Sequence, residues 1–454
     1  MARAGCGGMT MISSKLASFI AGIKYENLTK EVREAAKAAI MDWLGSTVAG
    51  SREAPAGMVA AIVRRAGGSP AASLIGLEEK SSALNAALVN GVAGHILELD
   101  DLHRSSILHP GAPIISAAAA AAEEVGAGGR ELITAVVAGF EVGIRIAEAV
   151  TPSHYYYWHT TGTCGTFGAA AAACRVYGLE EDEIVNALGN AGSQAAGLWE
   201  FLSDGAMTKH LHPGKAAMNG LLAAQLAGEG FTGASRILEG EKGFFRATAE
   251  EYFPEKATAG LGREYRITGN SYKIYPSCRH THPGVDLILQ LKAEGLDPSA
   301  VETILFKTYR HAVNLVGGND YSTPYKAKFC LPYCAAKALI DGRLDLDSFD
   351  FSNGHEALIE QLAGAVTVQF DPGVEEAYPL CWGTAVEVNL KEGRTLTAET
   401  DYPKGDPENP ASAAEMREKF LYLAGLCWPE KRAHRVLEML LGLENLEQTG
   451  DLFK

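Results

Sequence analysis

Small residues dominate the chain from residue 82 to residue 230, and this feature most constrains the fold. Segments rich in alanine and glycine follow one another there with almost no strand-like alternation, as in APIISAAAAAAEE, GTFGAAAAACRVYGL and AAMNGLLAAQLAGEG. Small side chains let helices approach one another closely. Residues 12–66 add apolar positions at helical spacing, with a capping start at Leu28-Thr29 and Glu31. We therefore predict a tightly packed, mostly helical domain.

The pattern changes near Arg263. Four later segments alternate or are rich in β-branched residues, as strands are: residues 301–309, 365–370, 385–390 and 395–400. Helical patterns accompany them at 283–294 and 327–341. The segment YPKGDPENP indicates a linker, and residues 411–442 return to helix. We predict a helical domain of residues 1–263 plus 401–454 and an inserted α+β domain of residues 264–400, with a cleft at the junction where small-molecule sites tend to lie.

Charge and cysteine usage exclude several classes of protein. The 454 residues carry a formal net charge of −15, which disfavours a nucleic-acid partner, since sequence-independent binding needs a basic face. No apolar run is long enough for a membrane span and the start lacks a signal region, so we expect a cytoplasmic protein with no membrane partner. The eight cysteines form no CxxC pair, and no spacing matches a disulfide framework, a zinc site or an iron–sulfur cluster.

The stretch GHILELDDLHRSSILHPG (residues 94–111) concentrates titratable groups between two apolar segments. It holds three acids, three histidines and one arginine: Glu98, Asp100, Asp101, His95, His103, His109 and Arg104. If its flanks are buried helices, these groups lie close to the core, where pKa values shift toward those that acid–base chemistry needs. A solvated helix–loop junction with a His-Pro turn explains the stretch equally well.

Four further clusters place lysine, histidine, tyrosine or arginine just ahead of an expected helix. They are residues 155–163, 204–215, 272–283 and 325–333. Helix N-termini and cationic donors that converge on one cleft suit a substrate with several carboxylates, and nearby histidines supply proton transfer. Each cluster also has a structural explanation, as a capped aromatic loop, a solvated helix cap or, for 325–333, core packing.

Five motifs together resemble one enzyme family. They are ELDDLH…HPG (98–111), HTTGTCGTFGAAAAA (159–173), TKHLHPGKAAMNG (208–220), YKIYPSCRHTHP (272–283) and YKAKFCLPY (325–333). From about residue 13 to 442 the chain resembles the MmgE/PrpD family, which includes 2-methylcitrate dehydratase, cis-aconitate decarboxylase and iminodisuccinate epimerase. The resemblance implies a mainly α fold, with a large all-helical domain and a smaller inserted α+β lid domain. It also implies a homodimer without metal or organic cofactor.

The same resemblance implies the site residues. Carried over by motif, the catalytic positions are Glu98, His109, His159, Lys209, Lys273 and Tyr333. Lys209 and Lys273 are also expected to bind substrate, with further contacts from Arg279, His103, Thr160, Cys278 and His282. The chain departs from the family pattern at three positions: Glu98 replaces an aspartate and Leu102 a threonine of many members, and Cys278 stands where the decarboxylase branch carries a histidine.

These residues favour a cofactor-independent lyase acting on a small di- or tricarboxylate of the 2-methylcitrate/aconitate type. Lys209 and Lys273, helped by Arg279, would hold carboxylates and stabilise enediolate-like charge. His109 and His159 would transfer protons, and Tyr333 would donate to the leaving group as water is lost. Glu98 would orient a histidine or act as base. The alternatives are an epimerase or racemase of an amino- or imino-dicarboxylate, a cis-aconitate-type decarboxylase, and an anion-binding protein without activity.

Overall fold

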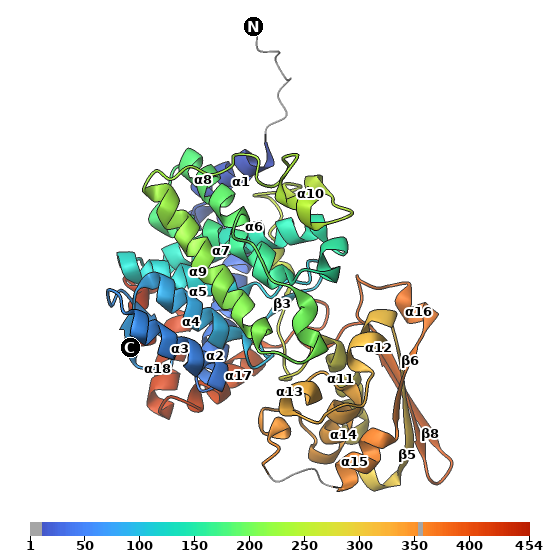
Figure 1. The fold of residues 1–454 in the computed structure, drawn as a ribbon. Coiled ribbons are helices and arrows are strands. Elements are labelled where there is room, and N and C mark those ends of the chain that lie inside the picture. Colours follow the sequence, from blue (N-terminus) through green and yellow to red (C-terminus); the bar gives the residue numbers. More distant parts are fainter. Residues whose placement is uncertain (1–10, 353–356) are drawn as a thin grey trace. The chain divides into compact units, whose positions relative to one another are not determined.

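The computed structural model describes residues 11–352 and 357–454, so Cys6 lies outside the described part. Contacts divide the chain into two compact units. The first comprises the chain up to Ile96, Asp100–Asn270 and Met416–Lys454, and the second comprises Leu97–Leu99 and Ser271–Glu415. The fold is mainly helical with a small mixed sheet in the C-terminal region, which confirms the predicted fold class (Figure 1).

The first unit is built from helices. In chain order they are α1 (Ile12–Gly22), α2 (Lys30–Gly50), α3 (Ala54–Ala66), α4 (Ala83–His95), α5 (Gly111–Val125), α6 (Gly129–Val150), α7 (Thr160–Tyr177), α8 (Glu181–Gly192), α9 (Thr208–Gly228), α10 (Phe244–Thr248), α17 (Ala413–Gly425, from Met416 onward) and α18 (Glu430–Leu441). The alanine-rich α5 and α7 are buried over most of their length, as expected of helices that are apolar on every face. Among the described helices, none has the length and apolar character needed to cross a membrane.

Two glycines bring α4 and α9 into backbone contact. A Cβ atom on Gly91 would lie 2.7 Å from Cα of Gly214, and one on Gly214 would lie 2.4 Å from the carbonyl oxygen of Leu88. Only hydrogen fits at either position, so larger side chains would separate the helices. This contact fixes the end of α4, where His95 lies, against the first turns of α9, which carry Lys209.

Helix α9 begins earlier than the sequence pattern predicts. The expected helix starts at residue 216, after the His-Pro-Gly triplet, because proline and glycine commonly interrupt helices. The observed helix starts at Thr208 and runs through Pro213. Proline there removes one backbone donor, and Gly214 provides the close contact with α4. Lys209 therefore lies inside the first turn of the helix rather than ahead of it.

The second unit contains a four-stranded sheet in the order β6-β5-β7-β8. Its strands match the four predicted segments: β5 (Val301–Thr308), β6 (Val366–Phe370), β7 (Thr384–Leu390) and β8 (Thr395–Thr400). Strand β5 runs parallel to β6 and antiparallel to β7, with Phe306 paired to Val368 and Val386. The buried positions of β7 alternate along the strand, and α11 (His282–Ala293) packs on β7 and β8.

The segment YPKGDPENP differs from the expected linker. Asp406 in this segment is 2% exposed, and its Oδ1 lies 2.5 Å from Nη2 of Arg279. The guanidinium also donates to the carbonyl oxygens of Pro403 and Lys404. A buried guanidinium needs several acceptors, and this segment supplies them, so it folds onto the second unit although its composition is that of a loop.

Candidate functional site

Four histidines from separate parts of the sequence gather inside the first unit. His95 ends α4, His109 precedes α5, His159 directly precedes α7, and His212 lies in α9. The ring centroid of His95 lies 4.9 Å from that of His109 and 5.8 Å from that of His159, and the centroids of His159 and His212 are 5.3 Å apart. We call these residues the histidine cluster.

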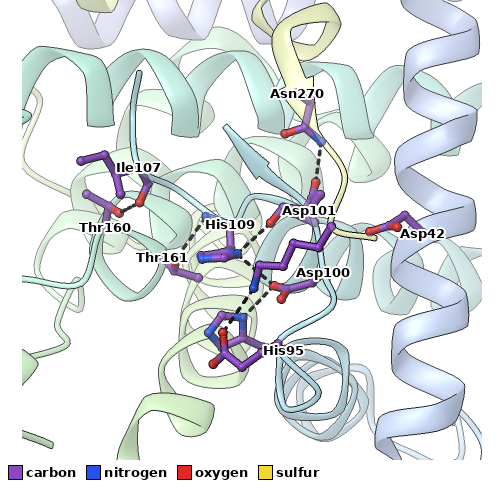
Figure 2. A network of polar contacts seen from close by, with 12 residues as sticks. Asp42, His95, Asp100, Asp101, Ile107, His109, Thr160, Thr161 and Asn270 are labelled. Atoms are coloured by element: carbon purple, nitrogen blue, oxygen red, sulfur yellow. Dashed lines mark hydrogen bonds and ion pairs between the residues drawn. The ribbon is translucent and has the colours of Figure 1, made fainter. Parts of the chain in front are cut away.

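The first turn of α7 holds the loop that carries His109. The hydroxyl of Thr160 donates to the carbonyl oxygen of Ile107 at 2.5 Å, and the N–H of His109 donates to Oγ1 of Thr161 at 3.2 Å (Figure 2). Ile107 has φ +48°, which is rare for a β-branched residue and is retained where the surroundings enforce it. Thr160, which the sequence predicts to touch substrate, binds this turn through its hydroxyl and holds the loop of His109 against the start of α7.

Asp101 anchors the start of α5 through its side chain. Its Oδ1 accepts from the N–H of Gly111 at 2.9 Å. Its Oδ2 accepts from Nδ2 of Asn270 at 2.7 Å (Figure 2). A Cβ atom on Gly111 would lie 2.8 Å from the carboxylate, so this close approach requires glycine. Burial, with Asp42 and Asp100 nearby, raises the pKa of Asp101 well above its ordinary value, and the two donors counter part of that rise.

Hydrogen bonds place a proton on Nδ1 of two cluster histidines. Nδ1 of His109 lies 2.7 Å from the carbonyl oxygen of Asp101, and because a carbonyl only accepts, this nitrogen donates. Nδ1 of His95 lies 2.7 Å from Oδ2 of Asp100. In the neutral rings Nε2 is then the basic atom. The side chain of His109 is 12% exposed whereas that of His95 is 0% exposed, so His109 is the more accessible base.

His159 and His212 form the other half of the cluster. Their Nδ1 atoms lie 3.1 Å apart, so one ring donates and the other accepts. Burial, followed by the influence of His212, His95 and Lys209, lowers the pKa of His159 far below its ordinary value. Burial also lowers the pKa of His212 to about 4. Both rings are therefore neutral at neutral pH, and they relay or accept protons rather than act as permanent cations.

His95, Asp100 and His109 also offer a set of atoms that divalent metals bind. One ligand atom from each lies within 4.8 Å of the others, and two histidines with one carboxylate are a known ligand set. The hydrogen bonds above, however, place protons on the Nδ1 atoms that face Asp100. An ion coordinated there by these nitrogens would have to displace both protons, so we interpret the group as one that holds protons.

In the second unit, Lys273 pairs with Glu98. Nζ of Lys273 lies 3.2 Å from Oε2 of Glu98, and both side chains are 1% exposed. Glu98 has φ +57°, an uncommon conformation for glutamate, and Nζ of Lys328 donates to the neighbouring carbonyl oxygen of Leu97 at 2.9 Å. The positive charge of Lys273, from a distant segment, thus neutralises the buried carboxylate of Glu98, a residue that the sequence motifs had indicated.

Several other expected site residues make bonds within the protein. Arg279 binds Asp406, and its Nη1 lies 3.0 Å from Nδ1 of His282. The hydroxyl of Tyr333 donates to the carbonyl oxygen of Ser348 at 2.6 Å. His103 contacts Oγ of Ser106 through Nδ1 at 3.0 Å. Cys278 is buried. These bonds support a structural role for Arg279, His282, Tyr333 and His103, and for Tyr333 to protonate a leaving group its present bond would have to break.

Sequence reasoning omitted His95, Asp100 and His212 from the site, although all three lie in the motifs it singled out. A signal was present for His95, which ends an apolar helix five residues before Asp100. A histidine at the buried end of a helix needs a polar partner, and the nearest acidic residues in sequence offer one.

Comparisons with known proteins show which family this chain matches and which proteins it resembles. The model of the MmgE/PrpD N-terminal domain matches residues 14–256, and that of the MmgE/PrpD C-terminal domain matches residues 275–445. The chain is 27% identical to a cis-aconitate decarboxylase-like protein of Aspergillus oryzae, covering 97% of this chain and 96% of the relative. It is 25% identical to human cis-aconitate decarboxylase, covering 97% and 93%. A 2-methylcitrate dehydratase of Cupriavidus necator is 23% identical, covering 62% and 60%.

Proposed function

Because the chain belongs to the MmgE/PrpD family, we propose that it is an enzyme that transfers a proton at the carbon next to a carboxylate of a small di- or tricarboxylate. The observation that carries this proposal is the fixed ring of His109. Its Nδ1 donates to Asp101, which leaves Nε2 as the atom that gives and takes the proton. Lys209, buried in the first turn of α9, supplies positive charge for the substrate.

Decarboxylation is the first candidate reaction. The sequence motifs alone favour loss of water, but relatives that align over nearly the whole chain include two named cis-aconitate decarboxylase and one named cis-aconitate decarboxylase-like protein. The 2-methylcitrate dehydratase aligns over less of the chain and at lower identity. We therefore place decarboxylation of an aconitate-type acid first and dehydration of a 2-methylcitrate-type acid second, with epimerisation of an amino- or imino-dicarboxylate third.

His109 and Lys209 could act in each of these reactions, but the step at which His109 gives or takes a proton differs between them. In decarboxylation the bond to the departing carboxylate breaks, carbon dioxide leaves, and its electron pair passes into the remaining conjugated carboxylate. His109 as a cation then delivers a proton to carbon. In dehydration the neutral ring first removes the proton α to a carboxylate. The C–O bond on the neighbouring carbon then breaks, the hydroxyl takes up a proton and leaves as water, and a carbon–carbon double bond forms. In both, the ammonium group of Lys209 stabilises the negative charge that develops on the carboxylate.

NMR of the purified protein in deuterated water tests the proposal and separates the reactions. The panel is cis-aconitate, 2-methylcitrate, citrate and a set of amino-dicarboxylates, with His109→Gln as the control protein. A decarboxylase releases carbon dioxide and places one deuterium on the product. A dehydratase forms an alkene from a hydroxy acid, and an epimerase exchanges deuterium without losing a group. If no compound reacts or exchanges, the proposal is wrong.

The departure from the family pattern at Cys278 gives a test of substrate choice. Cys278 stands where the decarboxylase branch carries a histidine, so Cys278→His moves the chain toward that pattern. If the native substrate differs from cis-aconitate at the group near this position, Cys278→His should raise turnover of cis-aconitate relative to that of the best substrate. Cys278→Ser is the matched control, since it changes polarity without adding an imidazole. Equal effects of both changes would contradict a role of position 278 in substrate choice.

A further inference from the structure

We propose that Asp100 is a positioning residue that holds His95 and His109 as a pair, so that both rings carry a proton on Nδ1 and present Nε2 as the proton-accepting atom. The effect of Asp100 on turnover rests on the function proposed above. Its effect on the tautomers of the two rings rests on hydrogen-bond geometry alone. His95 and Asp100 were both outside the set of site residues that the sequence analysis selected.

One carboxylate oxygen serves both rings. Oδ2 of Asp100 lies 2.7 Å from Nδ1 of His95 and 3.4 Å from Nδ1 of His109 (Figure 2). Nδ1 of His109 makes its shorter contact, 2.7 Å, with the carbonyl oxygen of Asp101. The Asp100 contact is therefore mainly electrostatic for His109 and a direct hydrogen bond for His95. Asp100 is 2% exposed, so water screens this interaction little.

The second nitrogen of His95 supports a role beyond packing. Nε2 of His95 is buried and has no hydrogen-bond partner among the described residues. A buried polar atom without a partner costs free energy, and such atoms in native proteins call for an explanation. The ring lies within the histidine cluster, next to His109 and His159. An acceptor kept in this place can take a proton from a neighbouring donor during turnover.

A carboxylate behind an imidazole fixes its tautomer and stabilises its cation. Because Asp100 faces two rings, its charge favours the form of each ring that carries a proton on Nδ1. Other charged or titratable groups also act on this part of the first unit. They are Asp101 on the same loop, Asp42 on α2, His159 before α7, and Lys209 and His212 on α9.

The first experiment needs no substrate. In full-length protein labelled with ¹⁵N-histidine, His95→Gln and His109→Gln assign the two rings by the loss of their NMR signals. The wild-type rings should carry the proton on Nδ1 when neutral. Asp100→Asn keeps the shape and removes the charge, so the two rings should take up a further proton at lower pH than in wild type. Asp42→Asn removes a buried carboxylate that acts on Asp101 and pairs with Lys419 rather than with a cluster histidine, so it should change that pH much less than Asp100→Asn does.

The second experiment measures turnover across pH with the best substrate. Asp100→Asn should lower kcat by about 10²–10⁴-fold with a much smaller change in KM, and the acidic limb of the rate profile should move to lower pH. Asp100→Glu should recover part of the rate, because it restores the charge. Asp42→Asn should shift the profile much less than Asp100→Asn does.

The outcomes separate this proposal from the proposed function. Neutral rings protonated on Nε2, or equal NMR titrations in wild type and Asp100→Asn, would overturn the positioning role. An altered titration with a normal kcat and pH profile would overturn its catalytic consequence. If wild-type protein turns over no carboxylate, the proposed function fails, and the NMR titration still decides the role of Asp100.

Discussion

The carbonyl oxygen of Asp101 accepts a hydrogen bond from Nδ1 of His109 across 2.7 Å, while the side chain of Asp101 accepts from the N–H of Gly111. One residue thus fixes both the imidazole and the start of the helix that follows it. The backbone contact sets the tautomer, and the side-chain contact sets the position of the turn. Proton transfer by His109 depends on this arrangement, because a ring that rotated about its side-chain bonds would lose the backbone contact that sets its tautomer.

Replacing His109 by glutamine should lower kcat by about 10²–10⁴-fold, the usual contribution of a general acid or base. Glutamine is polar and of comparable reach but does not exchange protons at neutral pH. Substrate affinity measured by calorimetry should fall much less than kcat. A variant that binds poorly but turns over bound substrate at the normal rate would make His109 a binding residue and pass the proton-transfer role to His159.

Changing Lys209 to alanine should weaken substrate binding and turnover strongly while the fold survives. Lys209 is 3% exposed and its charge acts on His159, so its interaction with a bound carboxylate is screened little. Lys215 on the same helix is only partly buried, and Lys215→Ala is the matched control because a more exposed charge contributes less. A wild-type kcat/KM in Lys209→Ala would remove this residue from the site.

The sequence predicted the type of each unit because the signals were local. Strands β5, β6, β7 and β8 match segments chosen from alternation and β-branching. Local sequence patterns do not predict the structure where a residue distant in sequence determines it. The start of α9 depends on the contact between Gly214 and Gly91, and the burial of Asp406 depends on Arg279.

In the candidate site, too, local motifs predicted some residues, whereas contacts between distant segments determine the roles of others. Motifs selected His109 and His159, and the structure brings their ring centroids within 6.4 Å. The sequence does not show that Asp100 and Asp101 have different roles, because they are identical residues next to each other. In the structure Asp100 faces two imidazoles, whereas Asp101 anchors a helix start. Their roles differ because backbone direction aims one carboxylate at His95 and the other at Gly111.

Breaking the pair between Lys273 and Glu98 should destabilise the second unit. Both side chains are 1% exposed, and removing one partner of a buried pair typically costs about 3–5 kcal/mol, because the other charge stays buried. Lys273→Met should therefore lower the unfolding temperature in calorimetry. The double change Lys273→Met with Glu98→Gln should recover most of the loss, and equal stability of the single and double variants would contradict the pairing.

Adding a methyl group at Gly214 should reduce both stability and activity. The new Cβ would lie 2.4 Å from the backbone oxygen of Leu88, so α4 and α9 must separate, and overpacking of this kind typically costs about 1–3 kcal/mol. The value of kcat/KM should also fall in protein that is still folded, since α4 ends at His95 and α9 carries Lys209. Gly57→Ala in α3 is the control: its Cβ meets nothing within 4 Å, and stability should rise by up to about 1 kcal/mol. Denaturant unfolding and kcat/KM check both variants.

Acid should destabilise the first unit well above the pH at which carboxylates titrate. Burial lowers the pKa of His103, His154 and His212 from 6.5 to about 4. Above pH 6.5 these rings are neutral in both the folded and the unfolded chain, so they favour neither state. As the pH falls from 6.5 toward 4, the unfolded chain takes up protons that the folded chain does not, and the free energy of unfolding decreases.

His154 offers the simplest test of this pH dependence, because it lies outside the histidine cluster and contacts Thr163 and the carbonyl oxygen of Thr248. The loss of stability between pH 7 and pH 5, measured by urea unfolding, should be smaller in His154→Gln than in wild type, since glutamine takes up no proton in this range. His434 is exposed, and His434→Gln should retain the wild-type slope. Equal slopes for all three proteins would show that buried His154 takes up protons in the folded state as readily as in the unfolded chain.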